Sequence, residues 1–261
     1  AAPVRRIAEG AGGERSVEPR SFYPPAEVAR RVAERVEAVR RAGEQIDYLT
    51  FVPDGEPTLD AGLEETIRLL RALDIPLAVI SNASLVWRPD VAAALSTADW
   101  VSLKVDTVDE PAWRRIHRPH PSLQLPIILD GIRRFTSEFP GALATETMLV
   151  AGINDDPVRL EATACYLQEA GVTEAWLGVP IRPTALAGVA APEAAAVAEA
   201  HRIFCRHLRQ VSSLAEDEEG AFSSGGDVVR DLLGVCAVHP MREAAVRALL
   251  AREAAPWSVV D

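Results

Sequence analysis

The chain has 261 residues, of which 48% are hydrophobic and 25% are charged, and its formal net charge at pH 7 is −11. A globular chain of this length buries roughly 70–75% of its unfolded surface, which is enough for one barrel-type core. The acidic balance argues against a broadly basic, nucleic-acid-binding surface, and no apolar run approaches the roughly 18 residues that a membrane span needs. Three scattered cysteines suit a reducing compartment rather than a secreted disulfide scaffold, so we expect a cytoplasmic protein without membrane contact.

Strand and helix patterns alternate along most of the chain. Residues 1–21 have no periodicity and predict a loop, after which Pro24 and Pro25 begin a helical pattern that ends at Gly43. Apolar runs then predict strands near 46–52, 77–82, 100–105, 144–150 and 175–180. Helix-period segments separate them, at 59–72, 89–97, 122–137 and 156–170. This alternation is typical of parallel βα units and therefore predicts an α/β barrel.

Polar or turn-forming residues follow or interrupt four of the predicted strands. They are Gly55, Glu56, Asn82, Lys104, Asp106 and Glu146. The reactive groups of a parallel barrel gather at the carboxyl ends of its strands, so we expect these residues to meet at one mouth. Two of them also have a structural interpretation, in which Asn82 turns the chain and Asp106 caps a helix that begins near Asp109.

Lysine usage singles out one of these positions. Among the 27 basic residues, Lys104 is the only lysine and all the others are arginine. A compact ammonium is not interchangeable with a guanidinium, so a lone lysine at a strand end predicts a functional contact. The alternative is a structural ion pair with Asp106 or Glu146. The basic stretch from Arg114 to His120 predicts either a contact with an anion or a solvated helix end and loop.

Seven segments of the chain form a recognisable series: FYPP (22–25), TFVPDGEPTLD (50–60), ISNAS (80–84), WVSLKVD (100–106), RPHPSL (118–123), ETMLVAGIND (146–155) and DLLGVCAVHPMRE (231–243). In this order they resemble the radical S-adenosylmethionine (SAM) enzymes, and among them iron-sulfur oxidoreductases related to the wyosine-forming tRNA enzymes. The resemblance covers nearly all of the chain. It implies a partial TIM-type (βα)6 barrel that here lacks its first strand.

The resemblance also implies two cofactors, SAM and a 4Fe-4S cluster. In such an enzyme the reduced cluster cleaves SAM to a 5′-deoxyadenosyl radical, which abstracts a hydrogen atom from the substrate. Glu56 and the backbone of Gly55 would bind the SAM ammonium, and Lys104 would bind the carboxylate of its methionine portion. Asn82 and Asp106 would contact the ribose hydroxyls.

Substrate and partners follow from the resemblance alone. Glu146 would serve either the ribose or the substrate. The substrate is unknown, and both tRNA and another protein are compatible with the family. An electron donor such as flavodoxin or ferredoxin is implied as a partner.

The cysteines depart from the family pattern. Family members hold the cluster with three thiolates in a C-x-x-x-C-x-x-C loop, whereas this chain has Cys165, Cys205 and Cys236, which are too far apart for one loop. Because the chain begins with Ala1, we expect the segment with the loop to be missing and the chain alone to be inactive. The alternative is a cluster-less barrel that acts as a SAM-binding or interaction module.

Three regions are expected along the chain: a loop remnant at 1–21, the barrel at 22–184 and an α-rich cap at 185–261. The cap contains helical patterns at 192–209, 227–233 and 240–253, and their arrangement suggests a winged-helix-like domain. This interpretation brings Phe222, His239 and Met241 near the barrel mouth. We expect them to pack rather than react, because isolated residues of these types are mostly structural.

Overall fold

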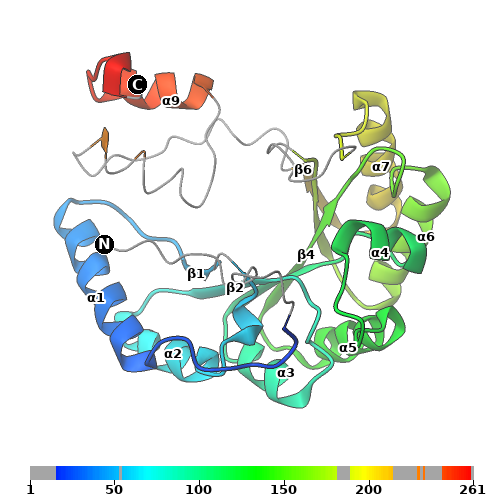
Figure 1. Cartoon of the computed structure of the whole chain (residues 1–261), viewed down its shortest axis with the longest axis horizontal. Coiled ribbons are helices and arrows are strands. Elements are labelled where there is room, and N and C mark those ends of the chain that lie inside the picture. The colour runs from blue at the N-terminus through cyan, green and yellow to red at the C-terminus, as the bar shows by residue number, and fades with distance from the viewer. Residues whose placement is uncertain are drawn as a thin grey trace.

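The computed structural model of the chain describes residues 16–52, 55–180, 189–213, 228–229, 232 and 243–259. Its centre is a curved sheet in which six parallel strands follow one another in sequence order (Figure 1). The strands are β1 (Leu49–Phe51), β2 (Leu77–Ser81), β3 (Trp100–Lys104), β4 (Ala142–Met148), β5 (Glu174–Gly178) and β6 (Gln210–Ser213). The alternation of strands and helices therefore builds the open, barrel-like sheet that the sequence predicted.

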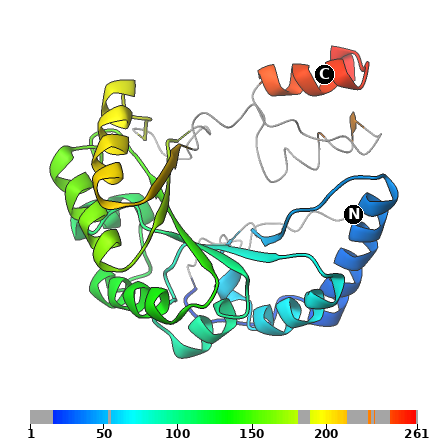
Figure 2. The same cartoon turned by 180° about the vertical axis from the view of Figure 1, so that it is seen from behind.

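The helices lie mainly on the convex outer side of this sheet, as the two opposite views in Figures 1 and 2 show. Five of them, α1, α3, α4, α5 and α6, carry a proline in their first turn, where no amide hydrogen is needed. The α-helices are α1 (Pro25–Arg41), α2 (Leu63–Leu70), α3 (Pro89–Leu95), α4 (Glu110–His117), α5 (Leu125–Glu138), α6 (Pro157–Glu169), α7 (Ala194–His207) and α9 (Glu243–Arg252). Short 3-10 turns are η1 (Pro57–Leu59), η2 (Arg71–Leu73) and η4 (Trp257–Val259).

The main core lies between the sheet and these outer helices. Strand β3 shows how the period of two divides the faces: Val101 and Leu103 are fully buried in the core, whereas Lys104 points to the other side and lines a cavity. From the helices, Ile67 and Ile132 are at most 1% exposed. Burying each such side chain contributes about 1.5–3 kcal/mol, so the core fixes the helices against the sheet.

Strand β6 was not predicted, because the last strand that the sequence pattern indicates lies near 175–180. Its residues, Gln210–Ser213, are short and polar and carry no strand signal of their own. The strand forms because its backbone pairs with β5, where Glu174 lies opposite Gln210 and Leu177 opposite Ser213. The sheet therefore continues past residue 184, where the sequence analysis placed the end of the barrel.

The carboxyl-terminal region contains helix α9 and a small apolar cluster of its own. Leu232, Val246, Leu249 and Leu250 form this cluster apart from the main core. The predicted positions of Phe222, His239 and Met241 lie outside the described residues, so the winged-helix interpretation stays a prediction. Among the described ranges, no helix combines the length and apolar character needed to cross a membrane.

Candidate functional site

A cavity of about 430 Å³ opens at the carboxyl ends of β1, β2 and β3. Five of the six residues predicted for the site line it, namely Gly55, Glu56, Asn82, Lys104 and Asp106. The opposite wall is apolar and comes from α4, α5 and the loop between them, with Trp113, Leu123, Leu125, Ile128, Leu129 and Ile132. The volume lies within the roughly 300–1,000 Å³ typical of small-molecule pockets.

Glu56 is buried at the start of the 3-10 turn η1, where its side chain caps the turn. Its Oε1 accepts hydrogen bonds from Ser81 Oγ at 2.6 Å and from Thr58 Oγ1 at 2.7 Å and Thr58 N at 3.1 Å. Its Oε2 accepts one from Asn82 N at 2.7 Å. Burial raises the pKa of Glu56, and the hydrogen bonds from Ser81, Asn82 and Thr58 offset that rise only in part. The carboxylate therefore ties the end of β1 to the end of β2.

Asn82 does turn the chain, as its structural interpretation predicted. Its Oδ1 accepts a hydrogen bond from Ser84 N at 2.9 Å, and the next residue, Ala83, has a positive φ of 61°. The amide nitrogen Nδ2 of Asn82 has no hydrogen-bond partner among the described residues, and the residue lines the cavity. The turn thus presents an unused donor to the cavity.

Lys104 forms the ion pairs that the sequence analysis gave as the alternative to a functional contact. Its Nζ lies 3.2 Å from Glu146 Oε1 and 3.4 Å from Asp106 Oδ1. Lys104 and Glu146 are direct neighbours in the register of β3 and β4, so their side chains share a face. Burial lowers the pKa of Lys104, but the two carboxylates outweigh burial and raise it above its ordinary value. Glu146 reaches the site through Lys104 and is not itself among the residues that line the cavity.

Asp106 is the most buried acid of the site, with a side chain that is 0% exposed. Its Oδ1 accepts a hydrogen bond from Met148 N at 2.7 Å, and its Oδ2 lies 3.0 Å from His117 Nε2 without a well-aligned hydrogen bond from any described residue. Burial favours the neutral acid, but Lys104 and His117 outweigh it and hold the pKa of Asp106 below its ordinary value. The helix cap predicted for Asp106 is instead made by Asp109, whose Oδ1 accepts from Ala112 N.

Two residues near Asp106 were missed by the sequence analysis. His117 was seen only as part of the basic stretch 114–120, and its place on α4 brings it against Asp106. Asn154 bonds to Asp106 across 48 positions of sequence, and no local pattern signals such a contact. The same basic stretch does form a helix end and loop, and Arg118 and His120 line the cavity at its rim.

The described cysteines lie away from this cavity. Cys165 is half-buried on α6, Cys205 is exposed on α7, and Cys236 falls outside the described residues. Among the described residues, no group of three His, Cys, Asp or Glu side chains could hold a metal ion. This part of the chain therefore does not supply the ligands of a 4Fe-4S cluster.

Comparison with known sequences identifies relatives along most of the chain. The family model described as the Radical SAM superfamily matches residues 12–162. A UPF0026 protein of Methanocaldococcus jannaschii is 37% identical over 249 residues, which cover 95% of this chain and 77% of that protein. A UPF0026 protein of Synechocystis sp. is 32% identical over 182 residues, 68% of this chain and 63% of the relative. The chain thus spans less than two thirds of some of its relatives.

Comparison with solved structures shows the same fold in proteins of low sequence identity. TYW1 with a lysine-pyruvate adduct bound gives a TM-score of 0.59 at 17% identity, over 74% of this chain and 66% of that one. Streptococcus suis SuiB bound to SAM gives a TM-score of 0.55 at 12% identity, over 80% of this chain and 49% of that one. These likenesses confirm the predicted α/β barrel-type fold. The family match over residues 12–162 establishes that the chain belongs to the radical SAM superfamily, whose cofactors are SAM and a 4Fe-4S cluster.

Proposed function

We propose that this chain is the SAM-binding barrel of a radical SAM enzyme and that SAM binds in the cavity at the ends of β1, β2 and β3. The observation that carries the proposal is that Glu56, Asn82, Lys104 and Asp106 line one cavity. Their carboxylates, amide and ammonium complement the ammonium, carboxylate and ribose hydroxyls that SAM carries.

Glu56 and Asn82 are proposed to bind the amino-acid portion and the ribose of SAM. Three donors converge on Glu56 Oε1, whereas among the described residues Asn82 N alone donates to Oε2, so Oε2 would keep a lone pair for the SAM ammonium. The Nδ2 of Asn82, which has no hydrogen-bond partner among the described residues, would donate to a ribose hydroxyl. Gly55 lines the cavity beside Glu56, where its backbone reaches the same part of the ligand.

Asp106 and Lys104 are proposed to act at the third strand. The Oδ2 of Asp106 accepts no well-aligned hydrogen bond from a described residue, and it would accept one from a ribose hydroxyl once His117, 3.0 Å away, moves aside, because the Asp106 side chain has no exposed surface. The Nζ of Lys104 has three hydrogens, and Asp106 and Glu146 engage two of them. Its side chain is 22% exposed, so the third hydrogen can meet the SAM carboxylate.

The finer assignments of this proposal are the wyosine-like branch, an oxidoreductase-type hydrogen abstraction, and tRNA or another protein as substrate. They rest on the seven motifs and on the likeness to TYW1. A second candidate is a SAM-binding or interaction module without a cluster, and the absence of a ligand trio among the described residues favours it. The two functions differ in whether a cluster accompanies the SAM cavity.

Anaerobic reconstitution distinguishes these two functions. The 261-residue chain and the product of the full reading frame of its gene would each be treated with iron and sulfide, desalted and assayed with SAM and a reductant. Iron bound to the product of the full reading frame, together with release of 5′-deoxyadenosine, supports the enzyme. SAM binding by both polypeptides without bound iron or 5′-deoxyadenosine would select the binding module instead.

A further inference from the structure

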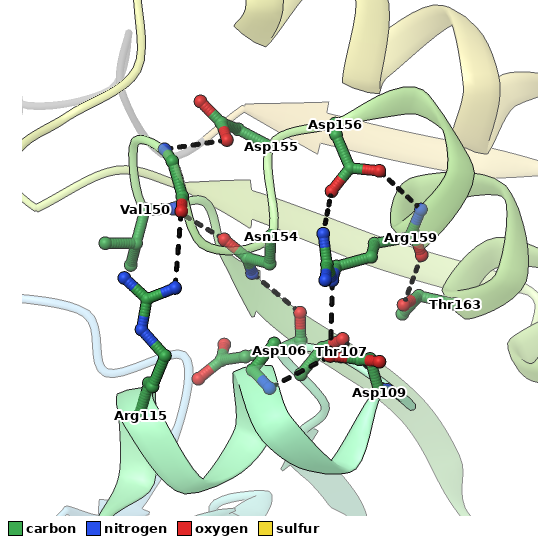
Figure 3. Close-up of polar contacts among 12 residues, drawn as sticks. Asp106, Thr107, Asp109, Arg115, Val150, Asn154, Asp155, Asp156, Arg159 and Thr163 are labelled. Atoms are coloured by element: carbon green, nitrogen blue, oxygen red, sulfur yellow. Dashed lines mark hydrogen bonds and ion pairs between the residues drawn. The ribbon is translucent and has the colours of Figure 1, made fainter.

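The side chain of Asn154 is enclosed where β3 and β4 end and is 1% exposed. Its Nδ2 donates to the carbonyl of Asp106 at 2.7 Å, and its Oδ1 accepts from Val150 N at 2.7 Å (Figure 3). Nδ2 also donates to the carbonyl of Met148 at 2.9 Å. Both amide hydrogens and the amide oxygen are therefore used. A buried asparagine with all of these bonds made fixes the two backbone segments that it touches, one at Asp106 and one from Met148 to Val150.

The backbone pairing of β3 and β4 changes character at this point. Val105 N still donates to the carbonyl of Glu146 at 2.9 Å, as in a regular ladder. The next donor of β4, Met148 N, would bond to the carbonyl of Val105 in a regular ladder but bonds instead to the side chain of Asp106, and the hydroxyl of Thr147 donates to the Val105 carbonyl at 2.7 Å in its place. Asn154 Nδ2 donates to the carbonyl of the next residue, Asp106. The bond from Met148 N holds the Asp106 carboxylate beside Met148, and the bond from Asn154 satisfies the buried carbonyl of Asp106.

The loop between β4 and α6 (149–156), which carries Asn154, also holds helix α4, the helix of His117. Arg159 Nε donates to Asp109 Oδ1 at 3.2 Å, and Arg159 Nη1 donates to Asp156 Oδ2 at 2.7 Å, so the start of α4 is joined to the start of α6 (Figure 3). Ala112 on α4 packs with Val150 and Ile153 of the loop. The groups that meet the Asp106 carboxylate are thereby held from three elements: the Lys104 ammonium from β3, the Met148 backbone N–H from β4 and the His117 ring from α4.

We propose that Asn154 is a positioning residue for the cavity, which acts by fixing the backbone at Asp106 and so aiming its carboxylate at Lys104 and His117. Asn154 does not line the cavity and would not touch SAM. Its effect on SAM binding, which rests on the proposed function, would pass through Asp106. A residue that served only stability would leave the geometry around Lys104 unchanged in every folded variant.

Two variants and a matched control separate these roles. Asn154→Ala removes all three hydrogen bonds, and Asn154→Asp keeps an acceptor for Val150 N but loses both donors. Thr163→Val is the control, because it removes a buried hydrogen bond to the carbonyl of Arg159 within α6 and leaves Asp106 untouched. Circular dichroism would establish that each variant is folded.

The first readout does not involve SAM. Because Lys104 is the only lysine of the chain, labelling with 13C,15N-lysine gives one set of side-chain NMR signals that needs no assignment. In Asn154→Ala and Asn154→Asp we expect the Lys104 signals to move toward their positions in Asp106→Asn, and in Thr163→Val to stay where they are in the parent. Unmoved signals in folded Asn154 variants would overturn the proposal.

The second readout is SAM affinity in a double-mutant cycle. We expect Asn154→Ala to weaken binding by about 10-fold, and to add less than about 3-fold in an Asp106→Asn background, because both changes disable one unit. If the fold-losses in SAM affinity of the two single variants multiply in the double variant, Asn154 does not act through Asp106.

If the parent binds no SAM, the proposed function fails, and the lysine signals still decide the role of Asn154. If both Asn154 variants fail to fold while Thr163→Val folds, Asn154 is a folding residue and the proposal is wrong.

Discussion

Lys104 is the residue on which the charge balance of the cavity depends. Its Nζ lies 3.4 Å from Asp106 Oδ1 and 3.2 Å from Glu146 Oε1. The Asp106 side chain has no exposed surface, so water cannot take the place of the lysine ammonium beside it. Removing one partner of a buried pair is costly because the remaining charge is left without compensation. The same geometry makes Lys104 a firmly protonated cation, since its pKa is raised.

Replacing Lys104 by methionine should lower the free energy of unfolding at neutral pH by about 2–4 kcal/mol. Lys104 helps to hold the pKa of Asp106 below its ordinary value, so the stability that this pair contributes is present above the unfolded-state pKa and lost as the pH falls through the folded-state pKa. The difference between parent and Lys104→Met should therefore shrink below about pH 4. Urea denaturation at several pH values would measure it.

Lys104→Arg is the matched control for this prediction. It keeps the charge but replaces a compact ammonium with a planar guanidinium, so it should recover only part of the lost stability. Lys104→Met as stable as the parent at neutral pH would show that the two carboxylates do not depend on the lysine.

At the scale of residues, the sequence predicted where the site residues lie better than it predicted which residues they contact. Glu56, Asn82 and Lys104 follow parallel strands, and strand ends of one sheet share an edge, so their meeting at one cavity was predictable. Whether Lys104 faced a ligand or its neighbours depended on the register of β3 and β4, which a single sequence does not specify. The contact of Asn154 with Asp106 depended on how a whole loop folds back.

At the scale of elements, helix α5 supports the apolar wall of the cavity through Leu125, Ile128, Leu129 and Ile132. Gly131 on the same helix allows α5 to approach the backbone of Trp87 closely. A Cβ atom added at Gly131 would lie 2.6 Å from Trp87 Cα and 2.7 Å from Trp87 N. Because backbone atoms cannot rotate away, any larger residue must push α5 from the segment before α3.

Gly131→Ala should therefore lower the free energy of unfolding by about 1–3 kcal/mol, although alanine is the better helix former. Ser137→Ala, at an exposed position of the same helix, should change stability by less than about 0.5 kcal/mol. Thermal and urea unfolding of both variants would test this. An unchanged or increased stability of Gly131→Ala would mean that α5 does not press on Trp87 as the structure has it.

The elements with strong periodic patterns were predictable, and β6 was not. The alternation of apolar runs and helix-period segments follows from side-chain periods of 2 and 3.6, which leave a local signal. Strand β6 has four residues, and only its pairing with β5 makes it a strand. Short edge strands of this kind depend on tertiary pairing, so they leave little signal in sequence.

At the scale of the whole molecule, the two cysteines that the structure describes lie on different helices, away from the cavity. Cys165 lies on α6 and Cys205 on α7, on the outer helices. The polypeptide of residues 1–261 should therefore not retain a 4Fe-4S cluster after anaerobic reconstitution, because it lacks three suitably spaced thiolates. Iron and sulfide analysis after desalting would test this, and a full cluster lost on replacing Cys165, Cys205 and Cys236 would contradict it.

The central claim is that the cavity at the carboxyl ends of β1, β2 and β3 binds SAM, and isothermal titration calorimetry of the chain with SAM tests it most directly. The account predicts one SAM per chain, with affinity at least about 10-fold weaker in Glu56→Ala and Asp106→Asn and unchanged in Thr163→Val. Circular dichroism of each variant would control for folding. A chain that binds no SAM, or that binds it equally well when Glu56 and Asp106 are replaced in folded protein, would contradict the account.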